Sequence, residues 1–452
     1  MQKVGQAIVD ASNFMWGPPL LVLLLGGGLF FALYSRFLPF KYFGHGLKVL
    51  AGKYDKADEP GQITHYQAVS TALAATVGMG NISGIAVAIT MGGPGAVFWM
   101  WVSALIGVTT KFFTCSLAVM YRGKDSEGNL QGGPMYVIKH GLGKKWMFLA
   151  VIFCLTAMIG VTPMFQANQL TQAIRDIVLV PNGVKTGMLT DLITGLFFAA
   201  VVILVIFGGI KRIASVASTM VPFMVILYVV SVLFILAKNY EGIIPGFQLI
   251  FWDAFTGDAV LGGSLGAIII VGVRRAAFSN EAGIGTAPMA HGAAKTGEPI
   301  REGLSAMFEP IIDTIIVCTM TALAIVVTGV WQETNADGIT LTAQAFSKGM
   351  PIIGPYILIA CVSIFSLTTM FAFPYYGTKA FSFLFGTKYK IIYQVFYIVV
   401  LPIGAVSTLR VVISLIDTAY ATMAFPTMIS AIILAPKILK EAKRYFGKMK
   451  GN

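Results

Sequence analysis

The chain has 452 residues, of which 56% are hydrophobic and only 12% are charged. Soluble domains carry about 25% charged residues, so the composition excludes a soluble globular protein and predicts an all-α protein that spans a membrane. The formal net charge of +12 could indicate a nucleic-acid partner, but the basic residues cluster in loops between apolar segments, which argues for membrane orientation instead.

Eleven apolar segments are long enough to cross a bilayer, which takes about 20 residues of helix. They are 15–36, 66–90, 96–121, 146–174, 187–208, 213–237, 262–291, 303–330, 351–376, 390–409 and 411–435. Segment 15–36 has no small-residue cleavage site, so it is interpreted as a retained helix.

Lys and Arg are concentrated in alternate loops, including 37–65 and 122–145, and in the tail 437–452. By the positive-inside rule this pattern predicts an external N-terminus and a cytoplasmic C-terminus. We expect four regions: an extra helix with its connection (1–62), two five-helix repeats (63–240 and 241–436), and a basic tail (437–452).

Two of the eleven segments carry helix breakers near their centres. Residues 71–90 read TALAATVGMGNISGIAVAIT, and residues 272–291 read GVRRAAFSNEAGIGTAPMAH. Unwound backbone inside a membrane is tolerated only where it is buried in protein or lines a cavity. These are the second and seventh segments, so they occupy matching positions in a five-plus-five arrangement. Interrupted helices at matching positions of two inverted repeats predict a transporter with a binding site at the midplane.

Several longer motifs are similar to those of the alanine or glycine:cation symporter family, which has the LeuT-type fold. They are TVGMGNISGIA, GGPGAVFWMW, GGPMYVI, FSNEAGIGTAPMAHGAAKT and IIDTIIVC. The resemblance covers nearly the whole chain. It implies a prokaryotic cell-membrane protein that imports a small neutral amino acid, alanine or glycine, together with Na⁺, and that needs no organic cofactor. The chain departs from the family pattern at Thr114 and at Ala372-Phe373.

The break in the second segment fits a zwitterion beside a cation. Free N–H groups at the start of its outer half attract a carboxylate, which predicts substrate contacts from Gly78, Met79 and Gly80. Free carbonyls between Ala74 and Val77 suit Na⁺. Thr368 and Thr369 resemble the hydroxyl pair that completes this Na⁺ site in the LeuT-type fold, and Asn81 resembles the amide ligand of a second one.

The rest of the predicted pocket comes from other segments. Carbonyls near residues 277–279, including that of Ser279, are expected to accept the substrate ammonium, and Phe278 and Phe373 are expected to wall the pocket. On the fourth segment, Phe165, Gln166 and Gln169 are further candidates. An amide there either faces the pocket or bonds neighbouring helices, and the sequence favours neither reading.

Charged residues within the spans are expected to pair with one another or to form a gate. They are Lys111, Arg274, Arg275, Glu281, Glu309, Asp313 and Asp417. Glu309 and Asp313 lie one helical turn apart, which predicts Arg274 or Arg275 as their partner. Glu281 flanks the second break and is the charge most suited to coupling.

Other classes of function fit the sequence less well. An enzyme is disfavoured because the chain has neither H-E-x-x-H nor G-x-S-x-G, and its four histidines lie in or near loops, where they are interpreted as surface residues. An ion channel would need a continuous polar pore rather than one site between two breaks. Proton coupling through Glu281 is the alternative to Na⁺ coupling.

Overall fold

The structure, a computed structural model, describes residues 2–56, 58–206, 209–256, 265–334 and 336–450. The predicted all-α class is confirmed, because the described strands are only β1 (Gly123–Lys124) and β2 (Leu130–Gln131), which form a short antiparallel hairpin.

The helices of the first half occur in the following order. They are α1 (Gln2–Met15), α2 (Pro18–Leu21), η1 (Val22–Gly26), α3 (Gly27–Tyr34), α4 (Leu38–Lys41), α5 (Phe43–Leu50), α6 (His65–Thr76), α7 (Met79–Gly92), α8 (Gly95–Met120), α9 (Pro134–Val137), η2 (Ile138–Leu142), η3 (Lys144–Trp146), α10 (Met147–Gly160), α11 (Met164–Ile174), η4 (Arg175–Leu179), α12 (Met188–Ile206) and α13 (Gly209–Lys238).

The second half continues the helical pattern. Its helices are η5 (Tyr240–Gly242), α14 (Ile243–Thr256), α15 (Leu265–Asn280), α16 (Ala287–His291), α17 (Pro299–Ala306), η6 (Ile311–Cys318), α18 (Thr319–Thr328), α19 (Val330–Glu333), α20 (Gly338–Gly349), α21 (Gly354–Phe385), η7 (Thr387–Tyr389), α22 (Lys390–Val406) and α23 (Leu409–Lys450).

Ten of the predicted segments correspond to helices that could cross a membrane. Among the described residues, eight helices are long and apolar enough, and two bent pairs, 5–34 and 65–92, pass the same test together. The remaining predicted segment, 262–291, corresponds to α15 and α16. Its residues 262–264, like 207–208 of the segment 187–208, lie outside the described residues. The count of eleven therefore stays a prediction.

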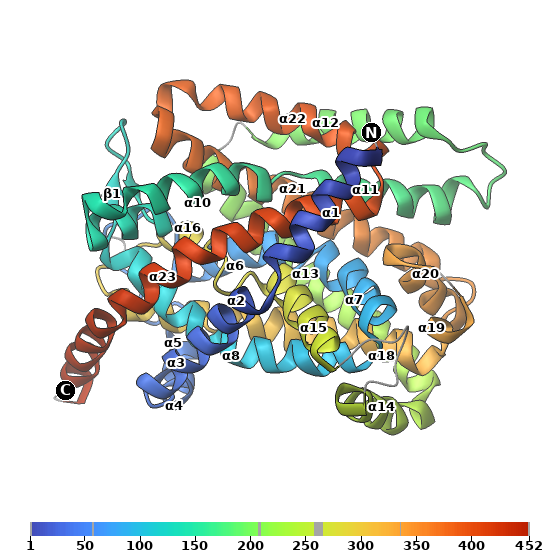
Figure 1. The fold of residues 1–452 in the computed structure, drawn as a ribbon, viewed down its shortest axis with the longest axis horizontal. Helices are drawn as coiled ribbons and strands as arrows, with labels where there is room; N and C mark the ends of the chain where they lie inside the picture. Colours follow the sequence, from blue (N-terminus) through green and yellow to red (C-terminus); the bar gives the residue numbers. More distant parts are fainter. Residues whose placement is uncertain (1, 57, 207–208, 257–264, 335, 451–452) are drawn as a thin grey trace.

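The N-terminal segment differs from the single helix predicted over 15–36. A helix already runs through residues 2–15, and the chain bends by 48° before it continues from Pro18. The sequence Gly17-Pro18-Pro19 explains the bend, because proline has no backbone N–H to continue the hydrogen-bond ladder. The first helix, α1, then packs along α23 (Figure 1).

Several connections between the helices lie at two ends of the molecule. Figure 1 shows the β1–β2 hairpin, α5 and the C-terminus at one end, and α19 and α20 at the other. The loops 37–65 and 122–145 thus share an end with the basic tail. The described part of this tail, through Lys450, continues the helix α23, which begins at Leu409.

Charged and histidine side chains form a chain of contacts in the buried core. Lys111 Nζ donates to Glu309 Oε2 at 2.6 Å, and the other Glu309 oxygen contacts His291 Nε2. His291 Nδ1 lies 2.5 Å from Glu302 Oε1, and the second Glu302 oxygen contacts His65. All five side chains are at most 1% exposed.

This network corrects two expectations. His65 and His291 are fully buried rather than surface residues, because α6, α8, α16 and α17 pack together around them. Glu309 pairs with Lys111 and not with an arginine. Neither Arg274 nor Arg275 reaches Glu309 or Asp313, since both bond Asp417 on α23.

The pair Lys111–Glu309 yields a prediction on stability. Removing one partner of a buried ion pair costs about 3–5 kcal/mol, because the other charge stays buried without compensation. We expect Lys111→Met to lower the midpoint of thermal unfolding of the detergent-solubilised protein, and Lys111→Met/Glu309→Gln to recover part of the loss. A double variant no more stable than Lys111→Met would contradict the pairing.

Candidate functional site

The first break separates α6 from α7. Helix α6 begins with a capping box in which the Thr64 side chain accepts from Gln67 N–H, and it ends at Val77, whose backbone is extended. The two helices are bent by 42°. Gly78 fits here because a Cβ at this position would lie only 2.7 Å from Thr369 Oγ1. The sequence therefore predicts the position of this break correctly.

Asn81 holds the break in shape. Its Oδ1 accepts the Gly78 N–H at 2.8 Å, and its Nδ2 donates to Asp313 Oδ1 at 2.8 Å and to Ser279 Oγ at 3.2 Å. One amide thus caps α7 and joins it to α15 and η6. Gly78 was expected to offer its N–H to the substrate, but in this structure Asn81 takes it. Met79 and Gly80 occupy the first turn of α7, where a helix leaves N–H groups without intrahelical acceptors.

The second break lies between α15 and α16, at residues 281–286. Helix α15 continues through Asn280, so the Ala277 carbonyl expected to be free accepts Glu281 N–H at 3.1 Å. The backbone then turns with positive φ at Glu281 (54°), Gly283 (84°) and Gly285 (109°). A Cβ at Gly285 would lie 2.4 Å from Thr427 Oγ1, so the unwound chain is enclosed by protein as a membrane requires.

A small cavity lies where the two breaks meet. Its lining includes most of the residues predicted around the breaks: Gly78, Met79, Gly80, Gln166, Phe278, Glu281, Thr369 and Phe373. Glu281 is 2% exposed and accepts a hydrogen bond from Tyr420 Oη at 2.6 Å and another from Thr286. The cavity therefore combines a helix N-terminus, a carboxylate and an aromatic wall.

Two of the three glutamines of α11, Gln166 and Gln169, have different surroundings. Gln166 lines the cavity, and its buried Oε1 has no hydrogen-bond partner among the described residues. Gln169 instead accepts from Ile339 N–H at 3.1 Å and from Ser83, and donates to Gln172 Oε1 at 2.9 Å. Gln166 thus fits the expectation of an amide that faces the pocket, whereas Gln169 joins helices α7, α11 and α20.

Two more of the predicted substrate residues lie behind the cavity wall. Phe165 is fully buried and packs edge-to-face on Phe278, with ring centroids 4.8 Å apart. Ser279 turns away to the carboxylate of Asp313. Neither lines the cavity in this conformation.

The two hydroxyls of α21 that were predicted to act as a pair, those of Thr368 and Thr369, point in different directions. Thr369 Oγ1 donates to the Ala74 carbonyl at 3.0 Å and to the Phe365 carbonyl at 3.1 Å, so it lies against the end of α6. Thr368 Oγ1 donates to the carbonyls of Ile364 and Phe365 and lies 3.6 Å from Met224 Sδ on α13. The structure thus brings Thr369, but not Thr368, to the carbonyls of α6.

Asp313 belongs to a separate polar cluster beside the first break. Its carboxylate accepts from Asn81 at 2.8 Å, from Thr314 Oγ1 at 2.9 Å and from Ser279. It is fully buried and has no cationic partner in the described part of the chain. Three neutral hydrogen-bond donors thus take the place of the expected arginine.

Two residues that line the cavity, Ile416 and Tyr420, were not predicted from the sequence. Ile416 and Tyr420 lie one turn apart on α23, so they share a face. The neighbouring Asp417, an acid within an apolar segment, was the available signal that this face is directed inward.

Comparisons with known proteins agree with this geometry. The family model described as the sodium:alanine symporter family matches residues 1–452. An uncharacterised transporter of Haemophilus influenzae is 40% identical, over 99% of this chain and 97% of its own. The sodium/alanine symporter AgcS of Methanococcus maripaludis is also 40% identical, over 96% of this chain and 95% of its own.

The fold has a solved counterpart. The crystal structure of MhsT in complex with L-phenylalanine superimposes with a TM-score of 0.57 at 12% identity, and covers 84% of this chain and 98% of that one. This similarity supports the LeuT-type fold. With the family model matched from end to end, the chain belongs to the sodium:alanine symporter family, a family of multi-pass membrane transporters and not of enzymes.

Proposed function

We propose that this protein imports a small neutral amino acid, alanine or glycine, by symport with Na⁺. The observation that carries the proposal is the enclosed cavity between the two helix breaks, which offers partners for both ends of a zwitterion. Membership of the family supports coupling to Na⁺.

The substrate carboxylate binds at the N-terminus of α7, where Met79 and Gly80 present backbone N–H groups and the positive end of the helix dipole. The ammonium binds Gln166 Oε1 and the carboxylate of Glu281, both of which line the cavity. Phe278 and Phe373 limit the space for the side chain, which favours a hydrogen or a methyl group.

Two positions suit Na⁺, which prefers oxygen ligands. The first lies at the end of α6, between the carbonyls of Ala74 and Val77 and the hydroxyl of Thr369. Thr368 would join it only after a change of rotamer. The second lies beside Asn81, where Asp313, Ser279 and Thr314 supply a carboxylate and two hydroxyls. A buried carboxylate without a protein cation is a strong partner for a transported one.

Transport proceeds by alternating access, in which the helices that carry the breaks rock against the remaining bundle. The broken helices occupy matching positions in two inverted five-helix repeats. Glu281 also supports the alternative of proton coupling, because a buried carboxylate at the cavity could carry a proton. Two enclosed breaks and a small cavity fit a single occluded site better than the continuous pore of a channel.

The coupling ion is tested by reconstitution. Labelled alanine should accumulate in proteoliposomes when an inward Na⁺ gradient is imposed at equal pH, and not when a pH gradient is imposed without Na⁺. Accumulation driven by the pH gradient alone would establish the proton-coupled alternative, and downhill flux that neither gradient drives uphill would indicate a channel.

The first Na⁺ position is tested on neighbouring threonines. Thr369→Val removes the hydroxyl next to Ala74, so we expect the half-saturating Na⁺ concentration for uptake to rise about tenfold, which corresponds to about 1.4 kcal/mol. Thr368→Val is the matched control, because its hydroxyl bonds only its own helix and Met224, and it should leave this concentration within about twofold. If both variants raise the half-saturating Na⁺ concentration equally, the first Na⁺ position is excluded.

Substitutions of Gln166 and Gln169 test substrate binding separately from stability. Gln166→Leu removes the free acceptor, so we expect about a tenfold loss of alanine affinity in equilibrium binding, with an unchanged unfolding temperature without substrate. Gln169→Leu leaves the buried Ile339 N–H unpaired, which costs about 1–3 kcal/mol of stability. If Gln166→Leu destabilises the empty protein while Gln169→Leu does not, the assignment is wrong.

A further inference from the structure

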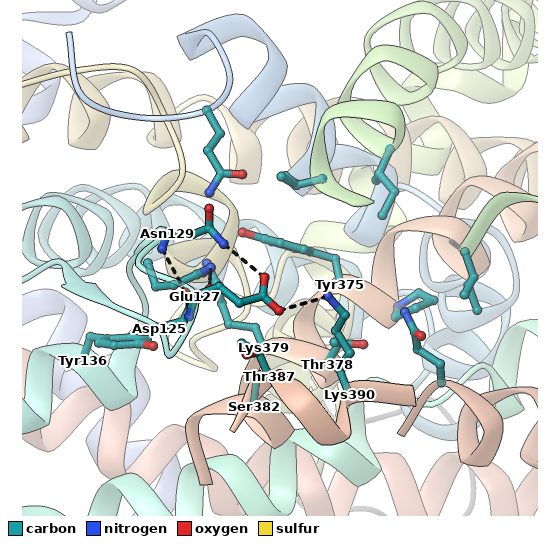
Figure 2. A pocket seen from close by; sticks show the side chains of 17 residues that line it. Asp125, Glu127, Asn129, Tyr136, Tyr375, Thr378, Lys379, Ser382, Thr387 and Lys390 are labelled. Carbon is teal, nitrogen blue, oxygen red and sulfur yellow. Dashed lines mark hydrogen bonds and ion pairs between the residues drawn. The ribbon is translucent and has the colours of Figure 1, made fainter. Parts of the chain in front are cut away.

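A second, larger cavity lies at the end of the molecule that carries the β1–β2 hairpin. Figure 2 shows side chains of the hairpin, such as Asp125 and Glu127, on one side of it, and side chains of α21 on the other. By the predicted orientation this end faces the cytoplasm. Pro374, which lines this cavity, directly follows Phe373, which lines the central one. The two cavities therefore both border the same turn of α21.

Lys379 is the unusual residue of this second cavity. It is only 6% exposed, and its Nζ donates to the Met289 carbonyl of α16 at 2.8 Å and lies 4.8 Å from the centre of the Tyr375 ring. No ion-pair partner is found for it within the described ranges. An ammonium group has three donors, and a buried cation without an anion is costly, so the site favours an anionic ligand.

Neutral donors lie around the same space. The hydroxyls of Tyr375 and Thr378 are buried without a hydrogen-bond partner among the described residues, and both line the cavity. Each can donate to a carboxylate. On the opposite wall, Glu127 is half exposed and lies 3.4 Å from Lys390 Nζ at the rim. The cavity thus has a cation at its buried end, and on the opposite side two acids, Asp125 and Glu127, of which Glu127 is paired with Lys390.

The contact between Lys379 and Met289 also joins a helix that follows a break to the remaining bundle. Met289 follows the second break on α16, while Lys379 belongs to α21, which packs against the first. If α16 moves away from α21 when the inner side opens, the ammonium loses its carbonyl acceptor. A carboxylate that arrives from the central cavity can then replace this acceptor.

We propose that this cavity is a release subsite, in which Lys379 takes the carboxylate of the amino acid on its way to the cytoplasm. The inference rests on the proposed function and adds a second binding step to it. Tyr375 and Thr378 donate to the same carboxylate, and Glu127 attracts the ammonium toward the mouth.

The test uses lactate, which keeps the carboxylate and methyl group of alanine but has no ammonium. Exchange of labelled alanine is measured in inside-out and right-side-out vesicles that contain the full chain. We expect lactate to inhibit from the cytoplasmic face at about tenfold lower concentration than from the external face. Lys379→Met should abolish this difference. Lys379→Arg, which keeps the charge, and Lys390→Met, which removes an exposed lysine of the same cavity, should retain it.

The outcomes separate the two proposals. Wild-type vesicles that show no Na⁺-dependent alanine transport would refute the proposed function. Wild-type vesicles that transport alanine but are inhibited equally from both faces, or a Lys379→Met variant that retains the difference, would overturn the release subsite. If Lys379→Met does not transport alanine, the release subsite is tested instead by the rise in unfolding temperature that lactate causes in Na⁺-free detergent. It should occur in the wild type and in Lys390→Met but not in Lys379→Met, and equal stabilisation of all three would refute the subsite.

Discussion

The central constraint on this protein is that every backbone polar group within the bilayer needs a partner. A regular helix meets this requirement by itself, and a broken helix does not. Here the unwound chain at Gly78 is paired by the side chain of Asn81, and the turn after Asn280 is enclosed by α10 and α23. Residues of both breaks, among them Met79, Gly80 and Glu281, line one small cavity between the helices.

The ionic contacts show how the surrounding helices stay fixed while the breaks stay irregular. The network from Lys111 through Glu309, His291 and Glu302 to His65 joins α8, α16, α17 and α6. In a second network, Arg274 and Arg275 join α15 to Asp417 of α23, and Arg274 also bonds Ser12 and Asn13 of α1. Glu281 is the one titratable acid among the described residues that line the cavity.

Much of this architecture could be predicted from the sequence, because lipid imposes simple rules on it. Span length, loop charge and the two glycine-rich interruptions located the segments and the site, and Met79, Gly80, Phe278 and Phe373 line the cavity as predicted. The partners of charged residues could not be predicted in this way. Periodicity places Glu309 and Asp313 on one face, but the neighbours of that face depend on how helices distant in sequence pack. The same limit explains why the sequence could not tell which of Gln166 and Gln169 faces the cavity, and why Tyr420 was missed.

The long helix α23 contacts three distant parts of the transporter. Along this single helix, Asp417 holds the arginines of α15, Tyr420 bonds Glu281 at the cavity, and Arg444 pairs with Glu298 near the C-terminus. Pro426 and Pro436 interrupt its hydrogen-bond ladder between the second and third of these contacts. The two prolines thus divide α23 into a segment that contacts α15 and the cavity and a segment that contacts Glu298, so one helix links the central cavity to the C-terminal end of the molecule.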